Sequence, residues 1–320
     1  MKRINNLYSQ IISLENLETS ELKARKGKTK QYGVRIFDKN KNKHLAELHE
    51  LLKNKLYQTS NYTTFTVYEP KERLVFKLPY FPDRITHHAI MNVMEPLFTK
   101  WFTNDSYSSI KGKGIHNASN NLKKALRDQK QTKYCLKLDI VKFYPNVNHD
   151  ILKQLLRKKI KDQDLLWLLN EIIDSAYGLP IGNYLSQYFA NFYLTYFDHF
   201  VKEDLKIKNY FRYADDIVIL SHSKQQLHQI LAAFKTYLST NLKLDIKNNY
   251  QLFPVAARGI DFVGYVHFHT HTLLRKSIKK RFAKAISKQK SKSVIDAYKG
   301  WTKHCDSKHL LKKLNTNAKI

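Results

Sequence analysis

Hydrophobic residues along the chain follow two spacings, and the order of these spacings predicts the fold. Apolar residues three or four positions apart predict helices at 5–22, 41–56, 84–102, 117–128, 149–177, 183–204, 223–239 and beyond Leu274. Short alternating or continuous apolar runs predict strands at 64–68, 73–78, 134–140, 210–220 and 250–269, and the last two ranges each hold a strand pair. Helices and strands mixed in this order predict an α+β fold, with a small, mostly antiparallel sheet backed by helices.

The most informative polar residues lie at the turn inside the strand pair at 210–220. Asp215 and Asp216 are adjacent there, although neighbouring carboxylates repel each other and cost free energy to bury. A third carboxylate, Asp139, lies in the strand-like run at 134–140. Three carboxylates at the ends of neighbouring strands can hold two Mg²⁺ ions for phosphoryl transfer. The alternative is that these aspartates are exposed turn residues without a ligand.

Composition indicates a folded protein with a polyanionic partner. The 320 residues include 56 Lys and Arg against 27 Asp and Glu, a formal net charge of +29, and 42% are hydrophobic. Aromatic residues make up 12% and can stack on bases. No apolar stretch reaches about 18 residues, so we expect no membrane insertion by this chain. Its two cysteines, Cys135 and Cys305, form no CxxC motif, which favours a reduced, cytoplasmic protein.

Seven segments occur in an order that is typical of one enzyme family. They read VYEPKERLVFKLPYFPDRITHHAIMNVMEPLF at 67–98, DSYSSIKGKGIH at 105–116, KLDIVKFYPNV at 137–147, LPIGNYLSQYFANFYL at 179–194, FRYADDIVIL at 211–220, GIDFVGY at 259–265 and LLRKS at 273–277. Over nearly its whole length the chain resembles reverse transcriptases, and most closely those of bacterial diversity-generating retroelements. The IGxxxSQ form at 181–187, where many reverse transcriptases have QG, is typical of that group.

The resemblance implies an RNA-directed DNA polymerase with a right-hand fold, in which fingers, a palm holding the antiparallel sheet and a short helical thumb surround a duplex. On this basis we expect N-terminal helices and a basic linker at 1–60, fingers at 61–133, a palm at 134–270 with a finger insertion at about 148–177, and the thumb at 271–320.

The resemblance also implies roles for the three aspartates. Asp139 and Asp215 would bridge two Mg²⁺ ions, for which Mn²⁺ can substitute. One ion would activate the primer 3′-hydroxyl, and the other would neutralise the nucleotide triphosphate. Asp216 would contribute charge and orientation, and the Ile140 carbonyl resembles the backbone metal ligand of the family.

Seven residues are expected at the incoming nucleotide: Lys71, Arg73, Tyr144, Ile181, Gly182, Gln187 and Lys247. Arg73 would clamp the triphosphate, because a guanidinium group matches phosphate oxygens. The Tyr144 ring would lie under the sugar and reject a 2′-hydroxyl; the alternative is a core aromatic, as expected for Phe143. Lys247 would protonate the leaving pyrophosphate, with a surface lysine as the alternative. For Lys71 the alternative is a solvated turn.

A second set is expected along the primer and template: Arg84, Lys111, Lys113, Tyr213, Gly264, Tyr265, Arg275, Lys276 and Lys280. The segment 259–265 resembles the primer grip, in which a tight backbone holds the primer 3′ end. The basic members would follow phosphates without reading sequence. For Arg84 the alternative is a structural ion pair with Asp83 at a helix start.

Three histidines alternate near the end of the last predicted strand pair. On a strand, His267, His269 and His271 would share one face. They would then form an exposed strand face or, with a further ligand, a zinc site.

Three biological roles are compatible with these residues. In the first, the enzyme copies a structured template RNA into cDNA with errors opposite adenine, as in mutagenic retrohoming; enzymes that it resembles work with a small, basic, helical accessory protein that forms a pentamer. In the second, a phage-defence reverse transcriptase copies a dedicated noncoding RNA beside a defence-system partner. The third is a non-catalytic RNA-binding scaffold, against which the presence of all three aspartates argues.

Overall fold

The computed structural model describes residues 3–68 and 72–317 and divides into two compact units, each assembled from distant parts of the chain. The first unit contains Met1–Thr103, Lys142–Phe197 and Ser239–Leu244, and the second contains Asn104–Val141, Asp198–Leu238 and Asp245–Ile320. Lys71, expected at the incoming nucleotide, lies outside the described residues. Both cysteines are free thiols, and none of the described helices is long and apolar enough to cross a membrane.

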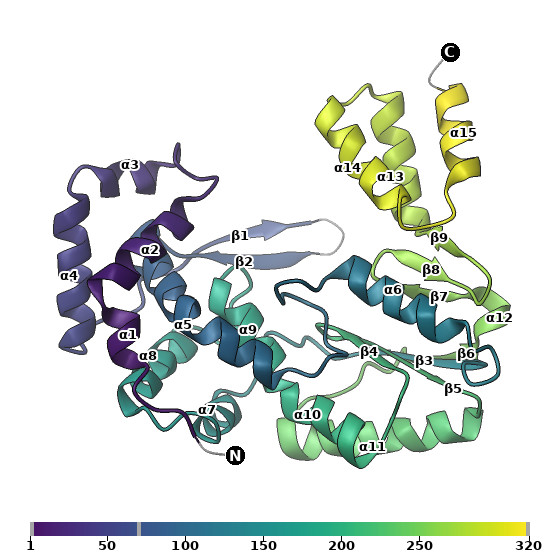
Figure 1. The fold of residues 1–320 in the computed structure, drawn as a ribbon, viewed down its shortest axis with the longest axis horizontal. Helices are drawn as coiled ribbons and strands as arrows, with labels where there is room; N and C mark the ends of the chain where they lie inside the picture. Colours follow the sequence, from purple (N-terminus) through teal and green to yellow (C-terminus); the bar gives the residue numbers. More distant parts are fainter. Residues whose placement is uncertain (1–2, 69–71, 318–320) are drawn as a thin grey trace. The chain divides into compact units, whose positions relative to one another are not determined.

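The first unit consists of helices and one two-stranded hairpin (Figure 1). Its elements are α1 (Tyr8–Ile12), α2 (Leu14–Arg25), α3 (Tyr32–Asp38), α4 (Lys41–Lys53), β1 (Thr63–Val67), β2 (Arg73–Lys77), α5 (Ile85–Trp101), α7 (His149–Arg157), α8 (Gln163–Asp174) and α9 (Tyr184–Tyr193). Helix α5 is central, because it packs against α1, α2 and α9 and buries Ile90, Met94 and Phe98 completely. The strand pair predicted at 64–68 and 73–78 is confirmed.

Capping residues divide two of the predicted helices. The helix predicted at 5–22 breaks at Ser13, whose hydroxyl caps α2. The helix predicted at 149–177 breaks before α8, because the buried Asp162 carboxylate accepts the Leu165 N–H and two backbone N–H groups at the start of α1. Apolar spacing alone does not reveal this second break, since the partners are far apart in the sequence.

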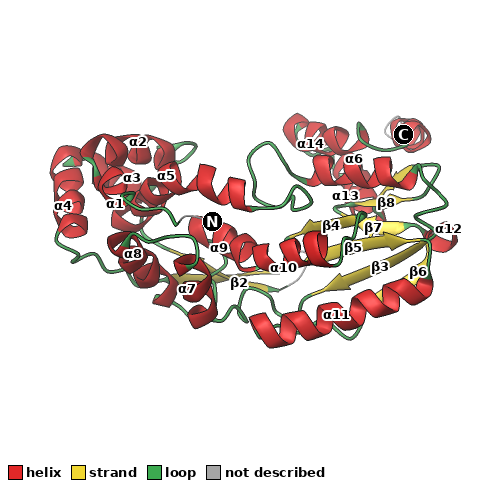
Figure 2. Ribbon diagram, turned by 60° about the horizontal axis from the view of Figure 1, so that its bottom comes forward, coloured by secondary structure: helices red, strands yellow, loops and turns green. Residues whose placement is uncertain are grey.

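The second unit is built on a four-stranded antiparallel sheet. The strand order is β4-β5-β3-β6, with bounds Tyr134–Asp139 for β3, Tyr210–Tyr213 for β4, Asp216–Ser221 for β5 and Gln251–Pro254 for β6. Helix α6 (Ile115–Leu126) covers one face and α11 (Lys224–Leu242) covers the other (Figure 2). Side chains alternate along β5, so Val218 and Leu220 pack in the cluster beneath α6 while Ile217 and Ile219 are buried on the opposite face.

The single strand pair predicted at 250–269 was wrong. Strand β6 pairs with β3 in the main sheet, with Phe253 opposite Cys135, and a separate three-stranded sheet follows the short helix α12 (Val255–Arg258). That sheet contains β7 (Ile260–Phe262), β8 (Tyr265–His267) and β9 (Thr272–Leu274). The sequence of a short strand does not specify its partner. The pairing of β6 with β3, more than a hundred residues earlier, depends on burial of both faces of the sheet.

The two remaining helical predictions also agree with the structure. The helix predicted at 183–204 is α9 followed by α10 (Thr195–His199) and a helical turn at Phe200–Asp204. After β9 the chain forms three basic helices, α13 (Lys276–Ser287), α14 (Lys292–Thr302) and α15 (Lys308–Asn317), as expected beyond Leu274. Mixed helices and antiparallel strands confirm the predicted α+β class.

Candidate catalytic site

Strand register brings the predicted carboxylates to one end of the main sheet. Asp139 ends β3 and Asp216 begins β5, and the two residues are direct cross-strand partners. Tyr213 is the partner of Asp216 on the other side, in β4. Asp215 lies in the two-residue turn between β4 and β5, after Ala214, whose φ of 55° is unusual for a residue with a side chain. The sequence prediction that strands carry these three aspartates to one place therefore agrees with the backbone.

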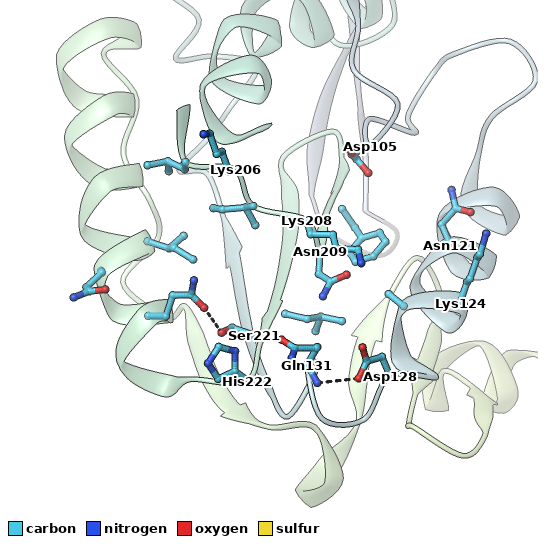
Figure 3. A pocket seen from close by; sticks show the side chains of 18 of the residues that line it. Asp105, Asn121, Lys124, Asp128, Gln131, Lys206, Lys208, Asn209, Ser221 and His222 are labelled. Carbon is cyan, nitrogen blue, oxygen red and sulfur yellow. Dashed lines mark hydrogen bonds between the residues drawn. The ribbon is translucent and has the colours of Figure 1, made fainter. Parts of the chain in front are cut away.

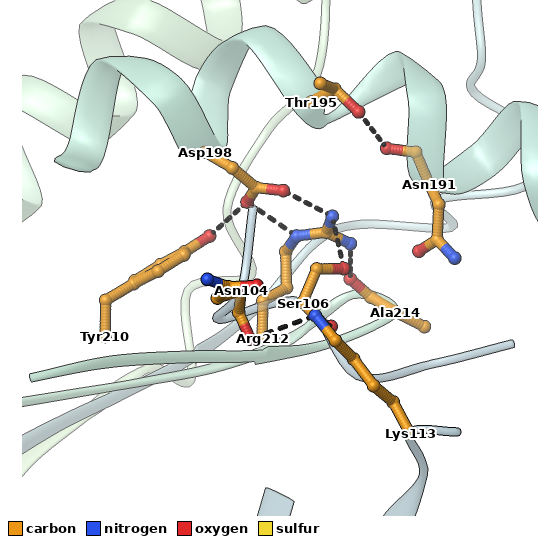
Figure 4. Close-up of polar contacts among 9 residues, drawn as sticks. All are labelled: Asn104, Ser106, Lys113, Asn191, Thr195, Asp198, Tyr210, Arg212 and Ala214. Carbon is orange, nitrogen blue, oxygen red and sulfur yellow. Dashed lines mark hydrogen bonds and ion pairs between the residues drawn. The ribbon is translucent and has the colours of Figure 1, made fainter. Parts of the chain in front are cut away.

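A fully buried ion pair holds this turn in place (Figure 4). The Arg212 guanidinium donates to Asp198 Oδ1 through Nε at 2.7 Å, to Ser106 Oγ at 2.9 Å and to the Ala214 carbonyl at 3.0 Å. Tyr210 also donates its hydroxyl proton to Asp198 Oδ1, at 2.7 Å. Sequence analysis missed this network, although an arginine inside an apolar strand next to the turn was a usable signal.

Burial and mutual repulsion perturb the carboxylates. Burial raises the pKa of Asp215 to about 6, and the negative charge of Asp139 adds to the increase. Burial also raises the pKa of Asp216 to about 6, against the opposing positive charge of Lys137. The Asp216 Oδ1 atom is buried and has no hydrogen-bond partner in the described structure. A buried carboxylate oxygen without a hydrogen-bond donor is a candidate ligand for a cation.

Two lysines partly neutralise the carboxylates. Lys247 Nζ lies 2.8 Å from Asp139 Oδ1, and the Lys247 backbone N–H donates to the Asp139 carbonyl. Lys137 Nζ lies 3.6 Å from Asp216 Oδ2. Lys247 was among the predicted residues, whereas Lys137 was not. Its position two residues before Asp139 on the same strand face was the available signal.

The donor set fits a divalent cation that binds together with its substrate. Among the described residues, no three His, Cys, Asp or Glu side chains form a complete metal-binding group by themselves. Mg²⁺ is usually bound through one or two carboxylates, waters and substrate phosphates rather than by an all-protein cage. The unpartnered Asp216 oxygen and the raised carboxylate pKa values fit such a partial site.

Most residues expected at the incoming nucleotide belong to the first unit. Arg73 is exposed at the start of β2, and Gln187 is exposed on α9. The Phe76 N–H donates to the Ile181 carbonyl at 2.7 Å, which ties the IGxxxSQ segment to β2. Tyr144 is partly exposed and packs edge-on against Phe143, which is buried as expected.

Gly182 occupies a place that no side chain can share. Its φ is 121°, and a Cβ atom there would lie 2.3 Å from the Phe76 carbonyl oxygen in β2. We therefore expect Gly182→Ala to lower the free energy of unfolding by about 1–3 kcal/mol. Urea unfolding measures this change, and Gly300→Ala is the control because nothing lies near the added carbon at Gly300. Equal stability of both variants contradicts this reading of the loop.

Arg84 lies at a basic cavity of about 270 Å³ within the first unit, where Lys28 and His88 also line the wall. Asp83 accepts hydrogen bonds from the Tyr57 hydroxyl and the Ser60 N–H instead, and none of the described ion pairs involves Arg84. Burial lowers the pKa of Lys28, and the charge of Arg84 lowers it further.

The residues expected along the primer and template differ in exposure. Lys111, Lys276 and Lys280 are exposed, whereas Arg275 pairs with Asp261. Lys113 donates to the backbone carbonyls of Asn104 and Ser106. Gly264 has a φ of 90° and lies against Trp301, and the buried Tyr265 donates its hydroxyl proton to the Trp301 carbonyl at 3.1 Å.

The three histidines do not share a strand face, so that expectation was wrong. Strand β8 ends at His267, which is buried, and burial lowers its pKa to about 3. His269 lies beyond the strand, within hydrogen-bond distance of the Thr132 carbonyl, and His271 stacks on Phe268. The chain turns after β8, so His269 and His271 do not continue the strand on which His267 lies.

Comparisons with known proteins agree with the geometry. The family described as "Reverse transcriptase (RNA-dependent DNA polymerase)" matches residues 68–267. Protein YkfC of Escherichia coli K12 is 25% identical over 66% of this chain and 66% of its own length. Retron Ec73 reverse transcriptase of Escherichia coli is 26% identical over 78% of this chain and 81% of its own.

Solved structures establish the fold. A telomerase from Candida albicans, in complex with a telomeric RNA fragment, superposes with a TM-score of 0.53 at 10% identity, over 73% of this chain and 51% of that chain. The chain thus spans about half of that structure and about two thirds of YkfC. The similarity shows the right-hand polymerase fold that was predicted. With the family match covering most of its length, the chain belongs to the reverse transcriptase family.

Proposed function

We propose that this protein is a metal-dependent RNA-directed DNA polymerase. The observation that carries the proposal is the register pairing of Asp139 with Asp216 beside a turn that bears Asp215. The raised pKa values of Asp215 and Asp216 support it. Buried carboxylates that repel one another are stabilised when a cation binds between them. The test is incorporation of dNTPs on an RNA template with Mg²⁺. A protein that binds RNA but makes no cDNA under any template condition is instead the scaffold considered above.

The residues divide the work of the reaction. The primer 3′-oxygen attacks the α-phosphorus of the nucleotide, and the bond to pyrophosphate breaks. We assign Asp139, Asp215 and the Ile140 carbonyl to hold two Mg²⁺ ions, which supply charge neutralisation and activation of the hydroxyl when bound. Asp216 supplies negative charge and orientation. We assign Lys247, whose ammonium group lies beside Asp139, as the general acid that donates a proton to the leaving pyrophosphate.

The subdomains of a polymerase are assigned on the same basis. We place N-terminal helices and a basic linker at 1–60, fingers with the β1–β2 hairpin at 61–133, and the palm with the main sheet at 134–270. The palm receives a finger insertion at about 148–177, and α13, α14 and α15 form the thumb at 271–320. We assign Arg73 of the fingers and Gly182 of the palm to the incoming nucleotide, and Lys276 and Lys280 of the thumb to duplex phosphates.

Tyr144 is proposed to select deoxyribonucleotides by excluding a 2′-hydroxyl. We expect Tyr144→Ala to raise ribonucleotide over deoxyribonucleotide incorporation at least about tenfold, because a steric contact of about 1–3 kcal/mol is removed. Parallel primer extensions with NTPs and dNTPs measure the ratio. Tyr177→Ala is a matched control, since Tyr177 is 85% exposed. An unchanged ratio in the Tyr144 variant means that the ring only packs against Phe143.

We propose mutagenic retrohoming as the biological role, in the cytoplasm, on a dedicated template RNA and with a small helical accessory protein. The IGxxxSQ segment at 181–187 supports this role. The alternative is a phage-defence enzyme that copies a noncoding RNA. We retain this second candidate role because the chain matches a protein named as a retron reverse transcriptase over most of both chains.

We expect the isolated chain to copy arbitrary primer-templates poorly and its cognate RNA well. Phosphate contacts supply affinity without sequence choice, so the choice must come from RNA shape or from a second protein. The measurement is cDNA yield with cognate RNA, scrambled RNA, and cognate RNA plus any small protein from the neighbouring locus. Equal yields from all three reveal a self-sufficient polymerase. A template and variable repeat pair that differs at adenines supports retrohoming, and a structured noncoding RNA without one supports the defence role.

A further inference from the structure

Helix α6 separates two cavities of the second unit. One has a volume of about 950 Å³ and is lined from α6 and its C-terminal turn by Asn121, Lys124 and Asp128. Figure 3 shows this cavity, with Lys206, Lys208 and Ser221 on its other walls. The second cavity, of about 490 Å³, is lined from α6 and the same turn by Asn120, Lys123 and Arg127, and from elsewhere by His269, Lys303 and His304.

Helical spacing explains how one helix serves both cavities. Ala118, Leu122 and Leu126 are fully buried and fix α6 to the sheet. Positions 120, 123 and 127 then fall along one flank and positions 121, 124 and 128 along the other. The exposed surface of α6 carries the amide side chains of Asn117, Asn120 and Asn121, and the sequence IHNASNNLKKAL of α6 contains no acidic residue.

The acidic groups of these cavities are already engaged by the protein. Asp105 pairs with Lys202 at 3.0 Å, Asp128 accepts the Gln131 N–H, and Asp306 accepts the Thr272 N–H at 2.8 Å. None of the described ion pairs involves the lysines at 124, 206 and 208 or the arginine at 127. The segment 123–133, which includes the basic residues of α6 and its C-terminal turn, contains five basic residues in all against one aspartate. Both cavities therefore present uncompensated positive charge.

The part of this surface near Ser221 and His269 lies away from the carboxylates. Ser221, which lines the larger cavity, is five residues along β5 from Asp216, a strand distance of about 17 Å. The smaller cavity includes His269, which contacts the Thr132 carbonyl just before β3 begins, at the same end of the sheet. The smaller cavity and the Ser221 side of the larger cavity are therefore at the opposite end of the sheet from the proposed metal site. The larger cavity also extends to Asp105, whose carbonyl accepts the Arg212 backbone N–H close to the turn that bears Asp215.

We propose that α6 and its two flanking cavities form a second RNA-binding surface, which docks a base-paired stem of the RNA. An α-helix with its side chains is about 10 Å wide, and A-form RNA offers a wide, shallow minor groove edged by 2′-hydroxyls. Asn117 and Asn120 can exchange hydrogen bonds with these hydroxyls, and Asn121, whose amide N–H donates to the Tyr107 hydroxyl at 3.0 Å, can accept one through Oδ1. Lys124 and Arg127 reach phosphates of the two strands on either side. The inference deepens the proposed function, since the docked stem belongs to the RNA that the enzyme copies.

Charge reversal on both flanks tests the proposal. The full-length Lys124→Glu/Arg127→Glu variant is titrated with a blunt RNA hairpin of about 16 base pairs and with the DNA hairpin of the same sequence. We expect RNA-stem affinity at 150 mM salt to fall at least about tenfold, and the slope of log affinity against log salt to become shallower by about two. Extension of an oligo(dT) primer on poly(rA) is expected to stay within twofold. Lys39→Glu, an exposed lysine of the first unit, is the control.

Asn120→Ala/Asn121→Ala supplies a second readout, since both asparagines are exposed and their removal leaves the charge unchanged. It is expected to reduce the preference for the RNA hairpin over the DNA hairpin. Unchanged stem affinity in the charge-reversal variant overturns the proposal. An equal loss of stem binding and poly(rA) extension also overturns it, because the surface would then belong to the primer–template path. Wild-type protein that binds the stem but extends no primer on any template, its cognate RNA included, refutes the polymerase function and leaves the docking surface standing.

Discussion

Asp215→Asn combined with Asp216→Asn is expected to abolish dNTP incorporation, with a loss of at least about a thousandfold. The substitutions keep the shape of both side chains and remove the charges that would hold two Mg²⁺ ions, which costs on the order of 4 kcal/mol at the transition state. Steady-state primer extension on an RNA template measures the loss. RNA affinity is expected to stay within about threefold, because these residues lie at the end of a strand and not in the core.

Stability separates a chemical effect from a folding effect in this variant. Burial and the Asp139 charge disfavour the ionised form of Asp215, so an amide in its place relieves repulsion in the absence of metal. Thermal unfolding in EDTA is therefore expected to show no loss of stability relative to wild type. Asp296→Asn is the matched control, since Asp296 is half-exposed on α14 and its one ion pair within the described part of the chain is with Lys299. Robust extension by the double variant refutes the site, and a large loss of stability shows a structural role instead.

Arg212→Met is expected to lower the free energy of unfolding by about 3–5 kcal/mol, the largest stability effect that we expect. It leaves the Asp198 carboxylate buried without its cation, and it removes the donor to the Ala214 carbonyl in the turn that bears Asp215. Urea unfolding followed by circular dichroism measures the change. Polymerase activity is expected to fall as well, because the turn that carries Asp215 loses its anchor.

Two comparisons make this result specific to the buried pair. Arg212→Met combined with Asp198→Leu removes both charges and is expected to recover part of the lost stability. Arg275→Met breaks an exposed pair with Asp261 and is expected to cost less than about 1 kcal/mol. If Arg212→Met costs no more than Arg275→Met, the buried pair does not stabilise the turn.

The sequence by itself determined the class of the fold, and it predicted which residues would carry out the proposed reaction. Alternation around 134–140 and 210–220 predicted the strands that carry Asp139, Asp215 and Asp216, because a buried sheet selects side chains with a period of two. The excess of positive charge indicated a polyanionic partner without any knowledge of the fold. Side-chain alternation is a local property and net charge is a sum over residues, so both follow from the sequence without the fold.

Only the tertiary structure decided which distant residues meet. The pairing of β6 with β3, the cap at Asp162 and the pairing of Arg212 with Asp198 each join residues whose own neighbours in sequence give no sign of the partner. Such contacts are selected by burial, since a buried polar group or strand edge must find whichever partner the packed chain brings to it. The same holds for α6, where spacing predicted an ordinary helix, and only the packed unit shows a basic cavity on each flank.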